Sequence, residues 1–156
     1  MPPLTITCTD PATGSLLGPE LPAMTPDEVR ACVARARTAQ RAWAKTSFAE
    51  RRRVLRRFLQ VTLDHTDEIC ELIVRDAGKT RENALLGEIL PVCEKLRHTI
   101  NTGERHLRPE RVSSGILLHK VATIEYHPLG VIGVISPWNF PFQNILGPLI
   151  PALFAG

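Results

Sequence analysis

The chain has 156 residues, of which 44% are hydrophobic and 22% charged, and its formal net charge is +3. These proportions are typical of a soluble domain, and they exclude collagen-like, intrinsically disordered and disulfide-rich proteins. The four cysteines are widely spaced and form neither a C-x-x-C pair nor a group with histidine. We therefore expect reduced thiols, no metal site and a cytoplasmic location.

The first residues predict a short strand followed by a turn. Residues 4–8 alternate in polarity as a short strand does, and Pro11 and Gly14 favour a turn after it. The first residues lack the basic start and apolar run of a signal peptide, so we expect none.

Residues 25–107 predict a helical region that contains two strong helix starts. Thr25 with Glu28, and Ser47 with Glu50, have the spacing of a capping box, in which each side chain bonds the other residue's backbone N–H. Apolar residues follow both starts at helical spacing.

Two more helices are expected in this region. The first ends near Gly78, a suitable helix C-cap. The second runs from Arg81 to about Thr102, and Pro91 inside it predicts a kink or a break. One face of this helix is expected to carry Leu85, Ile89, Leu96 and Ile100.

Residues 108–128 predict a polar linker followed by a strand at 117–126. The sequence then changes character, because residues 130–156 contain no Asp, Glu, Lys, Arg or His. The β-branched run at 130–135 predicts a strand buried on both faces of a parallel sheet. Residues 142–155 predict a helix interrupted by two prolines, Pro148 and Pro151.

The arginines between Arg30 and Arg57 permit two interpretations. They could form a nucleic-acid patch, or they could be the solvated face of helices whose apolar stripe lies between them. We favour the solvated face, because no aromatic residues are interleaved, and we expect no nucleic-acid partner.

The uncharged C-terminal segment also permits two interpretations. It is long enough to span a membrane, but its prolines and the amides of Gln143 and Asn144 would leave polar groups unsatisfied in lipid. We favour a core segment of a soluble protein, with membrane association as the alternative.

Two prolines constrain the segment Ile135-Ser136-Pro137-Trp138-Asn139-Phe140-Pro141, which directly follows the expected buried strand. Open α/β sheets bind their ligands at the carboxyl ends of strands. Ser136 lacks the G-x-S-x-G turn of a nucleophile, and neither G-x-G-x-x-G nor a phosphate-binding P-loop occurs. These patterns alone complete no catalytic site.

Residues 128–141 resemble the signature that precedes the cofactor site in the aldehyde dehydrogenase superfamily. The other motifs that agree, in order, are Asp10-Pro11-Ala12-Thr13-Gly14, Trp43, Glu50-Arg51, Ala77-Gly78-Lys79, Gly87-Glu88 and Ala152-Leu153-Phe154-Ala155-Gly156. The resemblance covers nearly the whole chain. Residues 87–90, 93–97 and 140–144 look more like the plant and fungal branch, whose members can carry a membrane anchor, so endomembrane association is the alternative location.

The resemblance implies an α/β fold and, specifically, the N-terminal portion of the aldehyde dehydrogenase fold. Residues 1–24 would be the β arm and 25–107 the helical packing region. Residues 108–128 would be the linker and an oligomerisation-type strand. Residues 129–156 would begin a Rossmann-like NAD(P)-binding domain with the first strand of its parallel sheet. A homo-oligomer is expected of an intact member.

The resemblance also implies a reaction, the oxidation of an aldehyde to a carboxylic acid with NAD or NADP. A cysteine thiolate adds to the aldehyde, hydride passes to the cofactor, and water hydrolyses the thioester. Asn139 is expected to donate its amide to the oxyanion of the tetrahedral intermediate. The residues expected to line the cofactor cleft are Ile135, Ser136, Pro137 and Trp138, with core packing as the alternative for Trp138.

The cysteine nucleophile, the glutamate base and the cofactor-binding lysine of this family correspond to positions after Gly156. None of the four cysteines of the chain lies in a matching motif. We therefore expect the 156-residue chain to be inactive alone. The alternative function is a non-catalytic truncated isoform that binds intact subunits.

Overall fold

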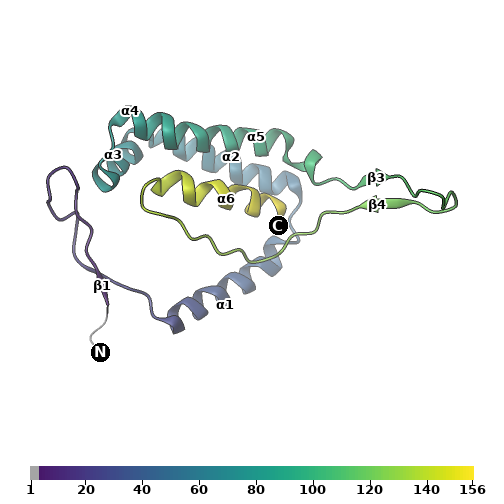
Figure 1. The fold of residues 1–156 in the computed structure, drawn as a ribbon, viewed down its shortest axis with the longest axis horizontal. Helices are drawn as coiled ribbons and strands as arrows, with labels where there is room; N and C mark the ends of the chain where they lie inside the picture. The colour runs from purple at the N-terminus through teal and green to yellow at the C-terminus, as the bar shows by residue number, and fades with distance from the viewer. Residues whose placement is uncertain (1–3) are drawn as a thin grey trace.

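The computed structural model describes residues 4–156 as a layer of helices with two small antiparallel hairpins (Figure 1). The elements are β1 (Thr5–Ile6), β2 (Leu21–Pro22), α1 (Pro26–Trp43), α2 (Phe48–Asp64), α3 (Thr66–Ala77), α4 (Arg81–Ala84), the π-helical turn η1 (Leu85–Ile89), α5 (Leu90–His106), β3 (Glu110–Val112), β4 (Ala122–Ile124) and α6 (Pro141–Ala155). In Figure 1, α2, α5 and α6 run side by side, whereas α1 begins away from them and reaches the end of α6 with its C-terminal residues, where Trp43 and Gln40 bond backbone carbonyls.

The two predicted capping boxes are confirmed. At the start of α1, the Thr25 N–H donates to the Glu28 carboxylate at 2.7 Å, and the Glu28 N–H donates to the Thr25 hydroxyl at 3.3 Å. Ser47 and Glu50 repeat these contacts at the start of α2 with the same two distances. The predicted C-cap is also found, since Gly78 ends α3 with φ of +65°.

The expected interruption at Pro91 takes the form of the π-helical turn η1. Pro91 has no N–H to offer the carbonyl of Gly87, and the Leu90 N–H bonds instead to the carbonyl of Leu85, five residues earlier. The helix then continues to His106, four residues further than predicted.

The expected apolar face of this segment is correct in three of its four residues. Ile89, Leu96 and Ile100 are buried. Leu85 is exposed, because the extra residue in the π turn rotates the residues before it relative to those after it.

The expected interruption of the last helix is wrong, because α6 passes through Pro148 and Pro151 without a break. Both prolines lie on its exposed side. Pro151 cannot donate to the carbonyl of Gly147, and the Lys95 ammonium donates to that oxygen instead, at 3.2 Å. Gly147 also lacks the Cβ that would meet the ring of Pro148 in a helical conformation.

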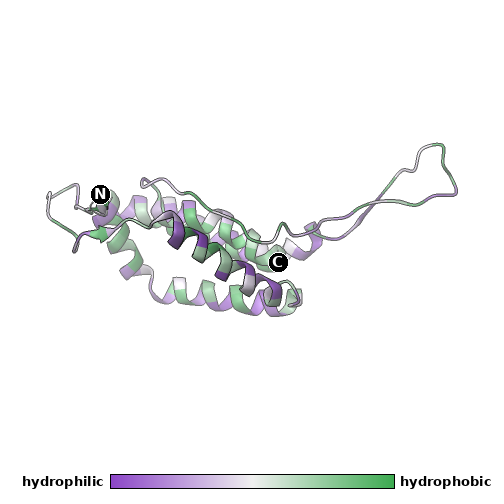
Figure 2. Cartoon of the chain, turned by 90° about the horizontal axis from the view of Figure 1, so that it is seen from below, coloured by the Kyte–Doolittle hydropathy of each residue, from purple (hydrophilic) through white to green (hydrophobic). Residues whose placement is uncertain are grey.

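The core lies where α5 and α6 pack against α2, with a second cluster between α3 and the η1 region. The first cluster contains Leu55, Val92, Leu96, Ile100, Leu146, Ile150 and Phe154. The second contains Cys70, Ile73, Ala84, Ile89 and Cys93. In Figure 2 most of the long helices carry both hydrophobic and hydrophilic bands, as amphipathic helices around a shared core do.

Both sheets are two-stranded and antiparallel. β1 pairs with β2, which gives the expected arm, and β3 pairs with β4 in the register Glu110↔Ile124. β3 was expected to be linker, and β4 is shorter than the expected strand. The chain turns at Gly115, with φ of +62°, so residues 116–119 form the hairpin tip and leave the ladder. The hairpin extends away from the helices (Figure 1).

Residues 130–135, expected to form a buried strand, form no strand, and residues 132–135 are exposed. Ile135 is fully exposed, and within residues 4–156 the run has no strand beside it. A parallel strand is buried only when neighbouring strands and covering helices are present, and the two hairpins lie elsewhere. Across the described residues, no helix combines the length and apolar character needed to cross a membrane.

Candidate functional site

The five predicted site residues lie on one exposed segment that leads into α6. Ile135 is fully exposed and Trp138 is 78% exposed. The Ser136 hydroxyl donates to the carbonyl of Pro137 at 3.2 Å. Asn139 lies in a turn directly before α6, and its side chain is exposed. The segment therefore presents apolar surface and one free amide, and it encloses no cleft by itself.

Phe140, next to Asn139, is held in place by residues from two other parts of the chain. The Lys79 ammonium lies 3.4 Å from the centroid of the Phe140 ring, which is a cation–π contact. Gly87 lies beside the ring, since a Cβ added there would be 3.4 Å from Cε1 of Phe140.

Glu88 of η1 caps the first turn of α6 from outside that helix. Its side chain is fully buried, and its Oε2 accepts from the N–H of Phe142 at 2.8 Å and of Gln143 at 3.3 Å. Phe140, the N-cap of α6, has no side chain that could accept these bonds. The negative carboxylate also lies at the positive, N-terminal end of the α6 dipole, which is a favourable interaction.

Lys79 neutralises this buried carboxylate. Its ammonium donates to Oε1 of Glu88 at 2.6 Å, and only 12% of its side chain is exposed. Both oxygens of Glu88 are therefore bonded, one to a cation and one to the backbone of α6. Removing one partner of a buried ion pair typically costs about 3–5 kcal/mol, because the other charge is left unpaired.

The role of Glu88 was missed by the sequence analysis, although the sequence contains a signal for it. Glu88 falls in a row of residues four apart whose other members are buried: Ala84, Val92, Leu96 and Ile100. A carboxylate in such an apolar row must find a partner or be expelled from the core. The row therefore marks Glu88 as a buried group with a structural or functional bond.

The β arm contacts this region through two more of the motif residues. A Cβ at Gly78 would lie 2.5 Å from Cγ of Pro11, so the turn of the arm rests on the end of α3. Together with Trp138, these residues line a shallow pocket of about 330 Å³. The motifs near residues 10, 78, 88 and 138 thus meet in space.

Other motif residues hold the C-terminal end of α6. Arg51 is 6% exposed, and it donates to the carbonyls of Phe154 at 3.0 Å and Ala155 at 2.8 Å. The indole N–H of Trp43 donates to the carbonyl of Leu153 at 2.8 Å. Burial lowers the pKa of the Arg51 guanidinium from its ordinary value.

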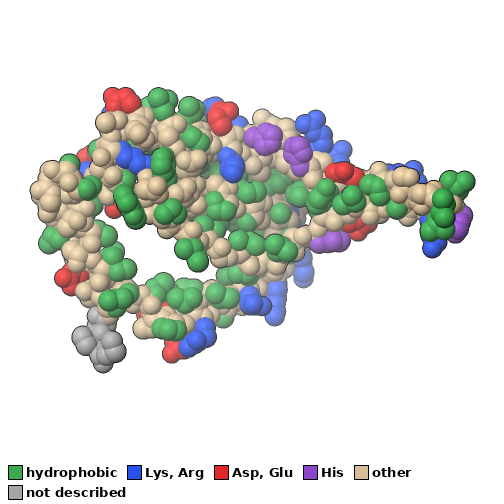
Figure 3. Space-filling model, viewed as in Figure 1, with side chains coloured by type: hydrophobic (Ala, Val, Ile, Leu, Met, Phe, Trp, Pro, Cys, Tyr) green, Lys and Arg blue, Asp and Glu red, His purple; other side chains and the backbone are tan. Residues whose placement is uncertain are grey.

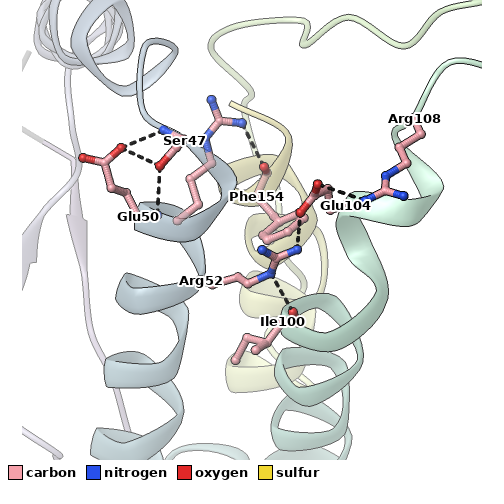
Figure 4. Close-up of polar contacts among 8 residues, drawn as sticks. Ser47, Glu50, Arg52, Ile100, Glu104, Arg108 and Phe154 are labelled. Atoms are coloured by element: carbon pink, nitrogen blue, oxygen red, sulfur yellow. Dashed lines mark hydrogen bonds and ion pairs between the residues drawn. The ribbon is translucent and has the colours of Figure 1, made fainter.

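The expectation of a solvated arginine face is therefore correct for Arg53, Arg56 and Arg57 and wrong for Arg51 and Arg52. Arg52 donates to the carbonyl of Ile100 at 3.1 Å and pairs with the carboxylate of Glu104 (Figure 4). Both arginines point into the helix layer, where Arg51 bonds carbonyls at the end of α6 and Arg52 bonds a carbonyl and a carboxylate of α5.

Two of the four cysteines are residues of the core and offer no accessible thiol to this site. Cys70 and Cys93 are buried in the second core cluster, and burial raises the pKa of the Cys93 thiol. Among residues 4–156, no group of three or more His, Cys, Asp and Glu side chains is placed to hold a metal ion.

The segment fits one wall of a cofactor cleft and does not fit a phosphate cradle. Ile135 and Trp138 offer exposed apolar surface to a ring system. The N-terminus of α6, where an anion could otherwise bind, already has its N–H groups bonded to Glu88. Phosphate groups would have to be held by other residues.

Comparison with known proteins matches the chain to one family along nearly its whole length. The sequence model of the aldehyde dehydrogenase family matches residues 3–156. An aldehyde dehydrogenase-like protein of Schizosaccharomyces pombe is 41% identical over 153 residues, which are 97% of this chain and 29% of that protein. One from Saccharomyces cerevisiae is 42% identical over 155 residues, 97% of this chain and 24% of that protein.

Solved structures with this fold include cofactor complexes. One is NADP-dependent glyceraldehyde-3-phosphate dehydrogenase from Bacillus halodurans, complexed with NADP, with a TM-score of 0.85 and 29% sequence identity. The match covers 98% of this chain and 32% of the chain of that enzyme. A methylmalonate-semialdehyde dehydrogenase from Sinorhizobium meliloti, complexed with NAD, has a TM-score of 0.86 at 27% identity, with 98% and 30% covered. The chain thus spans less than a third of the length of these relatives.

Proposed function

This chain belongs to the aldehyde dehydrogenase family, and on that premise we propose that its residues form the N-terminal part of an enzyme that oxidises an aldehyde to a carboxylic acid with NAD or NADP. The observation that carries the proposal is the placement of Asn139. Its free amide lies at the end of an apolar segment and directly before a helix whose first turn is fixed by Lys79 and Glu88.

In this proposal Asn139 stabilises negative charge on the substrate oxygen. When a nucleophile adds to the aldehyde carbonyl, the oxygen becomes an oxyanion, and the side-chain N–H of Asn139 donates to it. An uncharged amide suits this role because it needs no proton transfer. Removing one such donor typically lowers kcat by about 10²–10³.

The segment before Asn139 forms one wall of the cofactor site. When bound, NAD(P)+ supplies the acceptor for the hydride that leaves the substrate. Ile135 and Trp138 would contact it through apolar surface, and Ser136 and Pro137 through the backbone. Residues outside these 156 supply the phosphate contacts and the nucleophile.

The test is aldehyde-dependent reduction of NAD+ or NADP+, measured by the absorbance of the reduced cofactor. We expect turnover from the full-length protein that contains this segment and none from the purified 156-residue chain. Absence of turnover from the full-length protein with a panel of short and long aldehydes would refute the proposed activity. Turnover by the isolated chain would refute the proposal that the nucleophile lies outside these 156 residues.

We also propose a second, non-catalytic function for the isolated chain, which is binding to intact subunits. The β3–β4 hairpin supports it, because hydrophobic side chains gather at its exposed tip (Figure 3). Ile116 is 95% exposed and Leu118 is 89% exposed, and such residues mark a contact surface when they cluster. Co-expression of the tagged chain with the full-length protein tests this, and failure to co-purify would remove it.

A further inference from the structure

We propose that Lys79 and Glu88 are positioning residues for Asn139, and that they act by fixing the turn from which its amide projects. The inference rests on the proposed function, since it concerns how the oxyanion donor is held. Neither side chain is placed to contact a substrate, because Glu88 is fully buried and Lys79 nearly so.

Lys79 and Glu88 contact the residues that directly follow Asn139 in the chain. Lys79 holds the ring of Phe140, the next residue, from 3.4 Å. Glu88 holds the backbone N–H of Phe142, three residues after Asn139, at 2.8 Å. Because the two side chains also bond each other at 2.6 Å, they fix side chain and backbone of this stretch as one unit.

The support for this unit is rigid. Glu88 is carried by η1, and the residues one turn before and after it, Ala84 and Val92, are buried in the core. π-helical turns within α-helices are rare and occur often at functional sites. In this protein the π turn brings a carboxylate to the start of the helix that follows Asn139.

The charges of the pair also matter for the proposed reaction. A lone buried carboxylate near the turn would repel an oxyanion bonded to Asn139. The Lys79 ammonium cancels that charge, so the pair can fix the backbone without opposing the reaction. Loss of Lys79 is thus expected to be more harmful to catalysis than replacement of Glu88 by its neutral isostere.

A double-mutant cycle in the full-length protein tests the positioning role. The variants are Glu88→Gln, Lys79→Met and Asn139→Ala, alone and in pairs, and the measured quantities are kcat and KM for aldehyde and cofactor. We expect Lys79→Met to lower kcat by about 10- to 100-fold, as a displaced catalytic group does, and Glu88→Gln to lower it less, because the glutamine oxygen can still accept from the backbone of α6. We expect KM for the cofactor to remain within about twofold of the wild-type value.

The pairs distinguish positioning from general damage. If Glu88 and Lys79 act through Asn139, either substitution in the Asn139→Ala background has little further effect on kcat. If they only stabilise the fold, each lowers kcat by the same factor in both backgrounds, and the positioning role is overturned. If Asn139→Ala alone leaves kcat unchanged, the proposed function fails instead.

Glu94→Gln is the matched control, since it removes the exposed ion pair with Arg97 on α5, away from the turn. We expect it to leave kcat unchanged. If Glu88→Gln does not fold, as judged by circular dichroism and thermal unfolding, Lys79→Met carries the same cycle. If neither folds, Phe140→Leu replaces them, since it removes the ring that contacts Lys79. Phe140→Leu should then lower kcat in the wild-type background and have little further effect on kcat in the Asn139→Ala background.

Discussion

The ammonium of Lys95 in α5 donates to the carbonyl of Gly147 in α6 at 3.2 Å. Gly147 is the residue whose helical partner would be Pro151, four positions later, and a proline has no N–H to donate. A side chain from the neighbouring helix therefore supplies the missing bond. This contact explains how α6 remains continuous through its second internal proline.

We predict that Lys95→Met destabilises the chain by about 0.5–1.5 kcal/mol, the usual net value of one hydrogen bond. Methionine keeps the length of the side chain but cannot donate. Urea unfolding followed by circular dichroism measures the change. Lys120→Met, at the exposed hairpin tip, is the control and should change the free energy of unfolding by less than about 0.5 kcal/mol. Equal effects of both substitutions would show that the Lys95 contact has no special role.

We predict that Arg51→Lys destabilises the chain by about 1.5–3 kcal/mol, the range of bonds to charged groups. Lysine keeps the charge but cannot reach several carbonyls at once with a planar fork of donors. Arg53→Lys, on the exposed side of the same helix, is the matched control and should be neutral. Thermal unfolding distinguishes them, with a shift in Tm of about 2–4 °C per kcal/mol. An unchanged Tm for Arg51→Lys would contradict the proposed importance of the bonds from Arg51 to the end of α6.

Gly103→Ala is expected to destabilise the chain, although alanine is normally favoured over glycine in a helix by about 1 kcal/mol. An added Cβ would lie 2.6 Å from Cε1 of Phe154, which is itself buried in the core. Asn101→Ala, two residues earlier and exposed, should be neutral or slightly stabilising. A Tm for Gly103→Ala above that of the wild type would contradict the close packing of α5 on α6.

Stability should fall on acidification, in part through three glutamates. Hydrogen bonds from the Thr25 and Ser47 backbone lower the pKa of Glu28 and Glu50, and a hydrogen bond from Arg52 lowers that of Glu104. Because these pKa values are lower in the folded chain, the stabilisation is present above the ordinary value of about 4.3 and is lost as pH falls through the folded values.

Glu50→Gln tests this dependence, because glutamine keeps the capping geometry and does not titrate. The loss of stability between pH 7 and pH 3 should be smaller in this variant than in the wild type. Glu71→Gln, an exposed glutamate on α3, should leave the pH dependence unchanged. An identical pH profile for Glu50→Gln and the wild type would remove the capping box as a source of acid sensitivity.

Local signals predicted the helix ends well. Thr25, Ser47 and Gly78 satisfy backbone groups within a few residues of themselves, so the pattern that names them is enough to locate them. The prolines of α6 were misleading because their effect depends on α5. Nothing near Pro151 in the sequence indicates that Lys95 supplies a donor to Gly147.

The site was predictable in part, since the position of Asn139 before a helix follows from its sequence context. The residues that hold its turn are 60 and 51 positions away along the chain, at Lys79 and Glu88. Their bonds depend on the π turn and on how α6 lies against it, which the local pattern does not contain. The exposure of residues 132–135 has a similar cause, because a strand's burial is decided by its neighbours.

The most direct test of the proposed role of Asn139 is the ratio of kcat between wild type and Asn139→Ala in the full-length protein, with the folding of both verified by circular dichroism. Loss of the oxyanion donor should lower kcat by about 10²–10³, with KM for the cofactor nearly unchanged. A kcat within about twofold of the wild-type value would contradict the assignment of Asn139 as the donor.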